Sequence, residues 1–309
     1  MNQILKKYPV PVSGLILGLT SAGNLIQSYG NNLRSLFGII STIFYVLLLL
    51  KIIKYPNDIK ENLGNPAIGS VFPTFFMATM LLSVYLKPIN AHLSLYLWFA
   101  GVVLHLIYIA WFSFKFTFKF NIKQVLPSWF IVYVGIAVAG VTAPAFNMNI
   151  IGQMSFWFGL ISYIVLLPVV IYRVVKIKEI PEPVMPTLVI FAAPSSLLLA
   201  AYMNSFEVKN ITIIYLLMAV SILMYLYSII KLSGLIKLKF YPSFSGFTFP
   251  LIISGISMKL TNAYFIKIES PINVLIYLVK FQELIAIAIT LFVLFKYIKF
   301  IFAQSKATA

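Results

Sequence analysis

Residues 242–265 read PSFSGFTFPLIISGISMKLTNAYF, an apolar run that is interrupted by Gly246, Pro250 and Gly255. Proline in a helix interior costs about 3 kcal/mol and glycine about 1 kcal/mol relative to alanine, so an isolated helix would not tolerate this run. Inside a membrane bundle, neighbouring helices or a water-filled cavity satisfy the backbone groups that such breaks set free. The run therefore predicts a bent transmembrane helix that faces the inside of a bundle. Phe249, directly before Pro250, is the first candidate for a pore-facing residue.

The composition of the whole chain predicts an integral membrane protein of the all-α class. Of the 309 residues, 61% are hydrophobic and 10% are charged, and the mean hydropathy is +0.99. Soluble domains carry about 25% charged residues. A bilayer core about 30 Å thick needs about 20 apolar residues in each helix. Ten such runs predict a single transmembrane domain over residues 1–309, with spans at 9–28, 34–53, 66–86, 91–114, 125–146, 150–173, 184–205, 209–233, 242–265 and 272–300.

The basic residues are divided unequally between the loops. Seventeen lysines and arginines lie in the terminal segments and in alternate loops, whereas the remaining loops hold only Arg34, Lys87, Lys209 and Lys267. By the positive-inside rule, this imbalance predicts an even number of spans with both termini in the cytoplasm. Topology thus explains the net charge of +16, and we predict a lipid bilayer rather than nucleic acid as a partner. Many lysines, isoleucines and asparagines beside only two arginines favour an AT-rich bacterial genome, and hence a bacterial inner membrane.

The prolines reveal an internal repeat. Pro9, Pro66, Pro127, Pro186 and Pro242 stand near the start of alternate runs and are 56 to 61 residues apart, which is the period of one helical hairpin. A second breaker follows each of them after 7 to 9 residues: Gly18, Pro73, Gly135, Pro194 and Pro250. Prolines are concentrated in these odd-numbered runs. The pattern predicts five helical hairpins with pseudo-fivefold symmetry, in which an inner ring of kinked odd-numbered helices surrounds a pore.

The second breakers and their neighbours are the candidates for the pore lining. Phe72 and Phe249 each stand directly before a breaker proline, so they occupy equivalent places in two repeats. Most of the 27 phenylalanines are expected to pack in the core or against lipid, but this shared place favours a gating role for these two. The other candidates for kinking or lining the pore are Gly18, Pro73, Gly135, Pro194, Ser195, Ser196, Gly246, Thr248 and Pro250.

Three short motifs, set in five hairpins over nearly the whole chain, carry a family resemblance: VFPTFF at 71–76, FAAPSS at 191–196 and GFTFP at 246–250. With these motifs the chain resembles the TehA tellurite-resistance proteins, which are related to the plant slow anion channels and to yeast malate and sulfite carriers. The resemblance implies a homotrimer in which each protomer has its own pore of five inner helices. It also implies that a phenylalanine of the ninth span closes the pore. That residue corresponds to Phe249, and an aromatic residue of the third span that packs near it corresponds to Phe72.

Three charged residues lie well away from the ends of the predicted spans, where an ionisable group costs roughly 2.5–3.5 kcal/mol and marks a functional pathway by default. Lys259 lies in the outer half of its span. Its side chain could either extend to the membrane interface or face the pore. Lys280 and Glu283 are three residues apart, so they can meet on one helix face. We expect them to form a structural or trimer-interface pair, with a proton relay as the alternative.

These observations predict a passive channel for small monovalent anions such as chloride or nitrate. A pore without fixed charge would select anions by how readily they lose water. The alternative is a proton-coupled carrier of C4-dicarboxylates, sulfite or tellurite-type oxyanions, which would need a titrating group such as Glu283. The chain contains no cysteine and only two histidines, and it lacks a nucleophilic triad and a phosphate-binding loop. We therefore expect no enzymatic activity, no cofactor and no bound metal.

Overall fold

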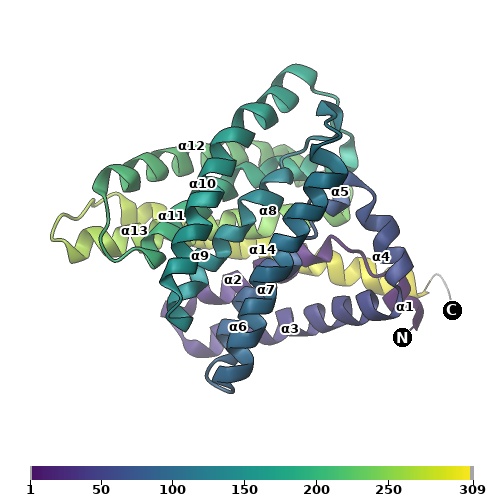
Figure 1. Ribbon diagram of the computed structural model, residues 1–309, viewed down its shortest axis with the longest axis horizontal. Coiled ribbons are helices and arrows are strands. Elements are labelled where there is room, and N and C mark those ends of the chain that lie inside the picture. Colours follow the sequence, from purple (N-terminus) through teal and green to yellow (C-terminus); the bar gives the residue numbers. More distant parts are fainter. Residues whose placement is uncertain (1, 307–309) are drawn as a thin grey trace.

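The computed structural model describes residues 2–306, and within that range the chain forms only helices and the loops that connect them (Figure 1). Five helices have more than 20 residues: α3 (Asn31–Lys54), α7 (Ala91–Phe112), α10 (Asn149–Tyr172), α12 (Ile211–Leu235) and α14 (Leu275–Lys306). Short π-helical stretches, Ser113–Thr117 and Arg173–Ile177, extend α7 and α10. We call these five the outer helices.

A second set of helical segments alternates with the outer helices along the chain and is shorter or interrupted. We call these the inner segments: α2 (Val12–Leu25); α5 (Pro66–Gly69) with α6 (Thr74–Leu86); α8 (Trp129–Tyr133) with α9 (Val138–Thr142); the 3₁₀ segment Glu182–Ala192 with α11 (Ala193–Ser205); and the 3₁₀ segment Pro242–Phe247 with α13 (Thr248–Lys267). Two further helices lie outside both sets, namely α1 (Asn2–Lys7) and α4 (Pro56–Leu63).

Eight helical stretches in the described part of the chain are long and apolar enough to cross a membrane. They are the five outer helices and three of the inner segments, Pro66–Leu86, Glu182–Ser205 and Pro242–Lys267. The predicted runs 9–28 and 125–146 contain shorter apolar helices, Val12–Leu25 and Gly135–Phe146. An all-α integral membrane protein is therefore confirmed, whereas the count of ten spans stays a prediction.

The inner segments and the outer helices differ sharply in burial. In the three inner segments that are long enough to span, 61–83% of the most apolar window is buried, against 28–33% in the outer helices. The exposed surface of the outer helices carries large apolar side chains, for example Ile43 on α3, Ile107 on α7 and Leu223 on α12. Contiguous exposed apolar surface of this extent is typical of a face that contacts lipid.

The inner segments contact one another in a closed cycle. Helix α2 packs against α6 and α13, α6 packs against α9, α9 against α11, and α11 against α13. Each also packs against the outer helix that follows it in the chain, as α2 does with α3 and α13 with α14. Helix α1 contacts α14, so the two ends of the described chain lie on the same side of the molecule (Figure 1).

Four of the five predicted breakers coincide with a change in helix type. The turn that ends at Pro73 separates α5 from α6, and a 3₁₀ turn begins at Gly135 between α8 and α9. Pro194 and Pro250 lie in the first turn of α11 and α13, directly after 3₁₀ segments. Proline is tolerated in the first turn of an α-helix, where its missing N–H has no intrahelical partner to lose.

The outer helices satisfy carbonyl groups that these breaks leave free. The Tyr108 hydroxyl on α7 donates to the carbonyl of Gly69, at the end of α5, over 2.8 Å. One turn earlier on α7, the Nε2 atom of the buried His105 lies 3.0 Å from the carbonyl oxygen of Val132, just before the Gly135 break. Neighbouring side chains thus provide what the sequence predicts a broken membrane helix to need.

Gly18 is the exception among the breakers, and the kink predicted there is wrong. Helix α2 is continuous from Val12 to Leu25. A Cβ atom on Gly18 would lie 2.3 Å from Oγ1 and 2.5 Å from Cβ of Thr248 on α13, which is closer than any real contact. Gly18 therefore permits a close approach of α2 and α13 rather than a bend in α2.

Candidate functional site

Two cavities lie inside the cycle of inner segments. The first, which we call the Ser245 cavity, has a volume of about 30 Å³ and receives residues from every inner segment. Its lining includes Gly14, Thr74, Gly135, Pro194 and Ser245. The second, the Asn24 cavity, has a volume of about 80 Å³ and is lined by Ser21, Asn24, Leu81, Val138, Val141, Leu197, Phe249, Ile253 and Ile256. Every inner segment again contributes, and no residue of an outer helix lines either cavity.

Only two side chains, Leu197 and Phe249, line both cavities. Leu197 lies on α11 and is 2% exposed, and Phe249 lies on α13 and is 6% exposed. We call these two shared apolar side chains the septum. Both shared side chains are apolar, so neither offers a hydrogen-bond partner to water or to an ion where the two cavities adjoin.

The lining of both cavities is mainly apolar and has no charged side chain among the residues that form it. Two serine hydroxyls stand out, because each is buried and makes no hydrogen bond: Ser245 in the first cavity and Ser21 in the second. Within residues 2–306 no group of three or more His, Asp or Glu residues is arranged to hold a metal ion. The site therefore offers uncharged hydrogen-bond donors within a mainly apolar lining.

The structure brings together five of the residues that the sequence singled out. Gly135, Pro194, Gly246, Phe249 and Pro250 all line the Ser245 cavity. They come from three different inner segments, and the breakers among them lie at the junctions where these segments change helix type. The repeat in the sequence thus located one part of the lining.

Other predicted lining residues lie outside both cavities and act in packing. The Ser196 hydroxyl lies 3.0 Å from that of Ser254 and so links α11 to α13. The Thr248 hydroxyl donates to the carbonyl of Ser245 over 2.8 Å, and Gly18 makes room for its side chain. Ser195 is fully buried without a hydrogen bond, and Pro73 ends the turn before α6, but neither lines a cavity.

Phe72 does not join Phe249 at the septum. Its ring packs in an aromatic cluster, with ring centres 5.8 Å from Phe75, 5.5 Å from Phe76 and 5.6 Å from Tyr108 on α7. The residues of the same turn that do reach the Ser245 cavity are Val71 and Thr74. The equivalence that the sequence predicts for Phe72 and Phe249 thus does not extend to where their side chains lie.

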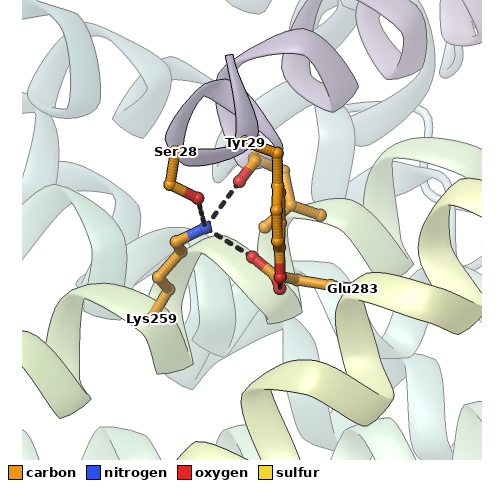
Figure 2. A network of polar contacts seen from close by, with 5 residues as sticks. Ser28, Tyr29, Lys259 and Glu283 are labelled. Atoms are coloured by element: carbon orange, nitrogen blue, oxygen red, sulfur yellow. Dashed lines mark hydrogen bonds and ion pairs between the residues drawn. The ribbon is translucent and has the colours of Figure 1, made fainter. Parts of the chain in front are cut away.

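The charged residues pair differently from the prediction. Lys259 on α13 forms an ion pair with Glu283 on α14 (Figure 2). Its Nζ also donates to the carbonyl of Leu25 over 2.9 Å and to the hydroxyl of Ser28 over 2.7 Å. The Tyr29 hydroxyl donates to the other oxygen of Glu283, which raises the pKa of Tyr29 above its usual value.

Lys280, the expected partner of Glu283, is exposed on the outside of α14. The predicted Lys280–Glu283 pair is therefore wrong, because α13 presents a lysine to Glu283 across the interface between the two helices. The Lys259–Glu283 pair ties the end of α2 to α13 and α14, and neither residue lines a cavity.

Sequence reasoning missed most of the lining, including Ser21, Asn24, Leu197 and Ser245. Ser21 and Asn24 lie three residues apart on α2, where that spacing puts polar side chains on one face of an otherwise apolar helix. This signal was present in the run LTSAGN at 19–24. Leu197 has no such signal, because an apolar residue on an apolar helix looks the same whether it faces a cavity or a neighbour.

The fold and the site define a multi-pass helical membrane protein with two cavities among its inner segments. Residues 9–298 match the voltage-dependent anion channel family, SLAC1, and the chain belongs to this family. The resemblance seen in the sequence motifs is thereby confirmed. Members of this family are anion channels or transporters rather than enzymes.

An uncharacterized transporter from Methanocaldococcus jannaschii is 26% identical to this chain over 177 residues, which cover 52% of each protein. The chain thus matches about half the length of this curated relative. The relative shares the general class of membrane transport protein with the chain.

Proposed function

We propose that the protein is a passive channel for small monovalent anions such as chloride and nitrate, and that Phe249 closes it. One observation carries this proposal: Phe249 and Leu197 are the two side chains that line both cavities. An apolar constriction of this kind gates an ion pathway because an ion cannot keep its water there. When the Phe249 ring leaves the septum, the two cavities become one continuous path.

The arrangement of helices supports a pore of five inner segments. The cycle of contacts from α2 through α6, α9, α11 and α13 back to α2 closes on itself. We propose that all five hairpins cross the membrane, which gives ten spans related by pseudo-fivefold symmetry. We further propose a homotrimer, as the family resemblance implies, in a bacterial inner membrane with both termini in the cytoplasm.

The lining supports selection of weakly hydrated monovalent anions. No charged side chain stabilises an ion in either cavity, and the available donors are hydroxyl and amide groups. Stripping water from an ion in such a place is expensive unless the ion has few charges and gives up its water readily. A dicarboxylate would have to shed the water around two charges, so we expect it to permeate poorly.

The alternative function, a proton-coupled carrier of dicarboxylates or oxyanions, requires a titrating group in the pathway. Glu283 is the intramembrane carboxylate that the sequence offers for that role. In the described structure its two oxygens are bound by Lys259 and Tyr29, and it lies outside both cavities. This geometry favours the channel.

The proposal is tested by anion flux from liposomes that contain the purified protein, under a chloride or nitrate gradient without a pH gradient. We expect wild type to be nearly silent and Phe249→Ala to conduct. Phe265→Ala is the matched control, because Phe265 is a buried phenylalanine of the same helix that lines neither cavity. Phe72→Ala tests the second predicted gate and is expected to remain closed.

Two results would contradict the channel proposal. One is an equal flux from Phe249→Ala and Phe265→Ala, which would show that the loss of any buried ring makes the protein leak. The other is that no variant shows flux under an anion gradient, while malate is taken up only when a proton gradient is present. In that case the carrier function would take its place.

A further inference from the structure

We propose that the Asn24 cavity is a binding site for one partly dehydrated monovalent anion, held by the hydroxyl of Ser21 and the amide NH₂ of Asn24. Arg34 positions that amide. This site deepens the proposed function and rests on it for its role in permeation. It would give the closed pathway a waiting position for an anion on one side of the septum.

The orientation of Asn24 follows from its contact with Arg34. The Nε atom of Arg34 lies 3.0 Å from the side-chain oxygen of Asn24. Guanidinium N–H groups only donate, so the amide must present its oxygen to Arg34 and keep its NH₂ group for another partner. Among the described residues this NH₂ group has no hydrogen-bond acceptor, and Asn24 lines the cavity.

Arg34 is itself held in place. Its guanidinium carbon lies 4.1 Å from the centre of the Tyr85 ring. The Tyr85 hydroxyl in turn donates to the carbonyl of Thr20 on α2 over 2.7 Å. An anion in the cavity would thus feel a fixed positive charge next to Asn24 without a direct contact that would bind it too tightly for conduction.

Ser21 supplies a second, independent sign of a ligand. Its side chain is 1% exposed and lines the cavity, and its hydroxyl makes no hydrogen bond. A buried hydroxyl without a partner costs about 1–3 kcal/mol. Serine and threonine in a helix usually relieve this by donating to the carbonyl four residues earlier, as the neighbouring Thr20 does to Ile16 over 2.8 Å. The hydroxyl of Ser21 is left free to meet a guest in the cavity.

The chemistry of the cavity selects an anion over a cation. The lining has no carboxylate, and its other residues are apolar. Two neutral donors and a nearby guanidinium match a halide or nitrate ion, whereas a cation would find only the oxygen of Ser21 free. The Ser245 cavity has one unpartnered hydroxyl instead of two donors, so we expect weaker binding there.

Binding is measured by thermal unfolding of the full-length protein in detergent, with sodium bromide replacing sodium gluconate at constant ionic strength. Bromide should raise the melting temperature of wild type with a half-maximal concentration that reports its affinity. Ser21→Ala should raise that concentration about five-fold, as expected for the loss of one hydrogen bond. Ser221→Ala is the matched control, because Ser221 is equally buried and unpartnered but lies on α12 outside both cavities.

Asn24→Asp is the sharper variant. It keeps the size of the side chain and its contact with Arg34, but it replaces the NH₂ donor with a charged oxygen. We expect it to abolish the bromide effect while the melting temperature in gluconate stays at or above that of wild type. Arg34→Lys, which keeps the charge and a donor, should retain more of the bromide effect than Arg34→Leu.

Conductance measurements show whether the binding site or the proposed function is wrong, because the two make different predictions. In the Phe249→Ala background, Ser21→Ala should raise the half-saturating bromide concentration, and Ser221→Ala should not. If current flows but Ser21→Ala and Asn24→Asp leave both half-maximal concentrations unchanged, the binding site is wrong and the channel stands. If no variant conducts yet bromide binding is lost in Asn24→Asp, the site stands and the channel is wrong. Equal bromide effects in wild type and all variants would overturn the site outright.

Discussion

Leu197 on α11 and Phe249 on α13 each line both cavities, the Ser245 cavity and the Asn24 cavity. Under the proposed function, these two side chains from neighbouring inner segments close the pathway. Both lie close to a breaker proline: Phe249 directly precedes Pro250, and Leu197 follows Pro194 by three residues. Removing either one should open the path in proportion to the volume that it fills.

We predict that Leu197→Ala conducts anions less than Phe249→Ala does and that the double variant conducts most. Leucine is smaller than phenylalanine, so its loss leaves more of the septum in place. The loss of a buried leucine typically costs about 2–5 kcal/mol of stability. Halide flux from liposomes measures the opening. Leu199→Ala is the control, because Leu199 is fully buried on the same helix and lines neither cavity. Equal flux from Leu197→Ala and Leu199→Ala would contradict the prediction.

The Lys259–Glu283 pair should support stability and not permeation. We predict that Glu283→Gln lowers stability by about 1–3 kcal/mol, because Lys259 loses its charged partner at a largely buried place. In the Phe249→Ala background, anion flux measured between pH 6 and 8 should be the same with Glu283→Gln as without it. Lys280→Met on the exposed face of α14 is the control and should change neither property. A loss of pH-driven malate uptake in Glu283→Gln would instead favour the carrier.

Two glycines offer a matched test of helix packing. Gly18→Ala should destabilise the protein strongly or separate α2 from α13, because its Cβ would lie 2.3 Å from Oγ1 of Thr248. Gly234→Ala should stabilise it by about 0.5–1 kcal/mol, since that Cβ would meet no atom within 4 Å beyond its chain neighbours and the backbone of its own helix, and alanine favours the helix. Thermal unfolding in detergent compares the two. Similar melting temperatures would mean that α2 and α13 do not approach as closely as described.

One loop contact predicts a dependence of stability on pH. Lys123 and Glu179 form an exposed ion pair at 2.9 Å, and this hydrogen bond and charge lower the pKa of Glu179 from its usual 4.5. A lowered pKa in the folded state adds stability above the unfolded value and loses it as the pH falls through the folded value. The melting temperature of wild type should therefore slightly exceed that of Glu179→Gln at pH 7. The difference should disappear in acid below the lowered pKa; a difference that persists there would argue against the pair.

Much of the fold could be predicted from the sequence, because the membrane imposes strong rules on it. The length of the apolar runs indicated the helices, and the alternation of prolines separated the buried inner segments from the exposed outer helices. Phe249 and the breakers Gly135, Pro194 and Pro250 were recognised by their place in the repeat, and all four line a cavity.

The errors come from contacts between segments far apart in the chain. The repeat predicts a bend at Gly18, but glycine also fits where a second helix approaches closely, and only the position of Thr248 distinguishes the two cases. Glu283 was matched with Lys280 three residues away, yet its partner Lys259 lies on the neighbouring helix. Spacing along one helix predicts which side chains share a face but not which face meets a partner.

The place of the septum between two cavities has an electrical consequence for the proposed pore. Where water reaches the cavities on both sides, the membrane voltage falls almost entirely across the layer formed by Leu197 and Phe249. An anion that crosses this layer moves through nearly the whole potential difference, worth about 2.3 kcal/mol for one charge per 100 mV. In the closed protein the two side chains thereby hold most of the voltage, whereas a variant that opens the septum should spread the voltage along the whole pore.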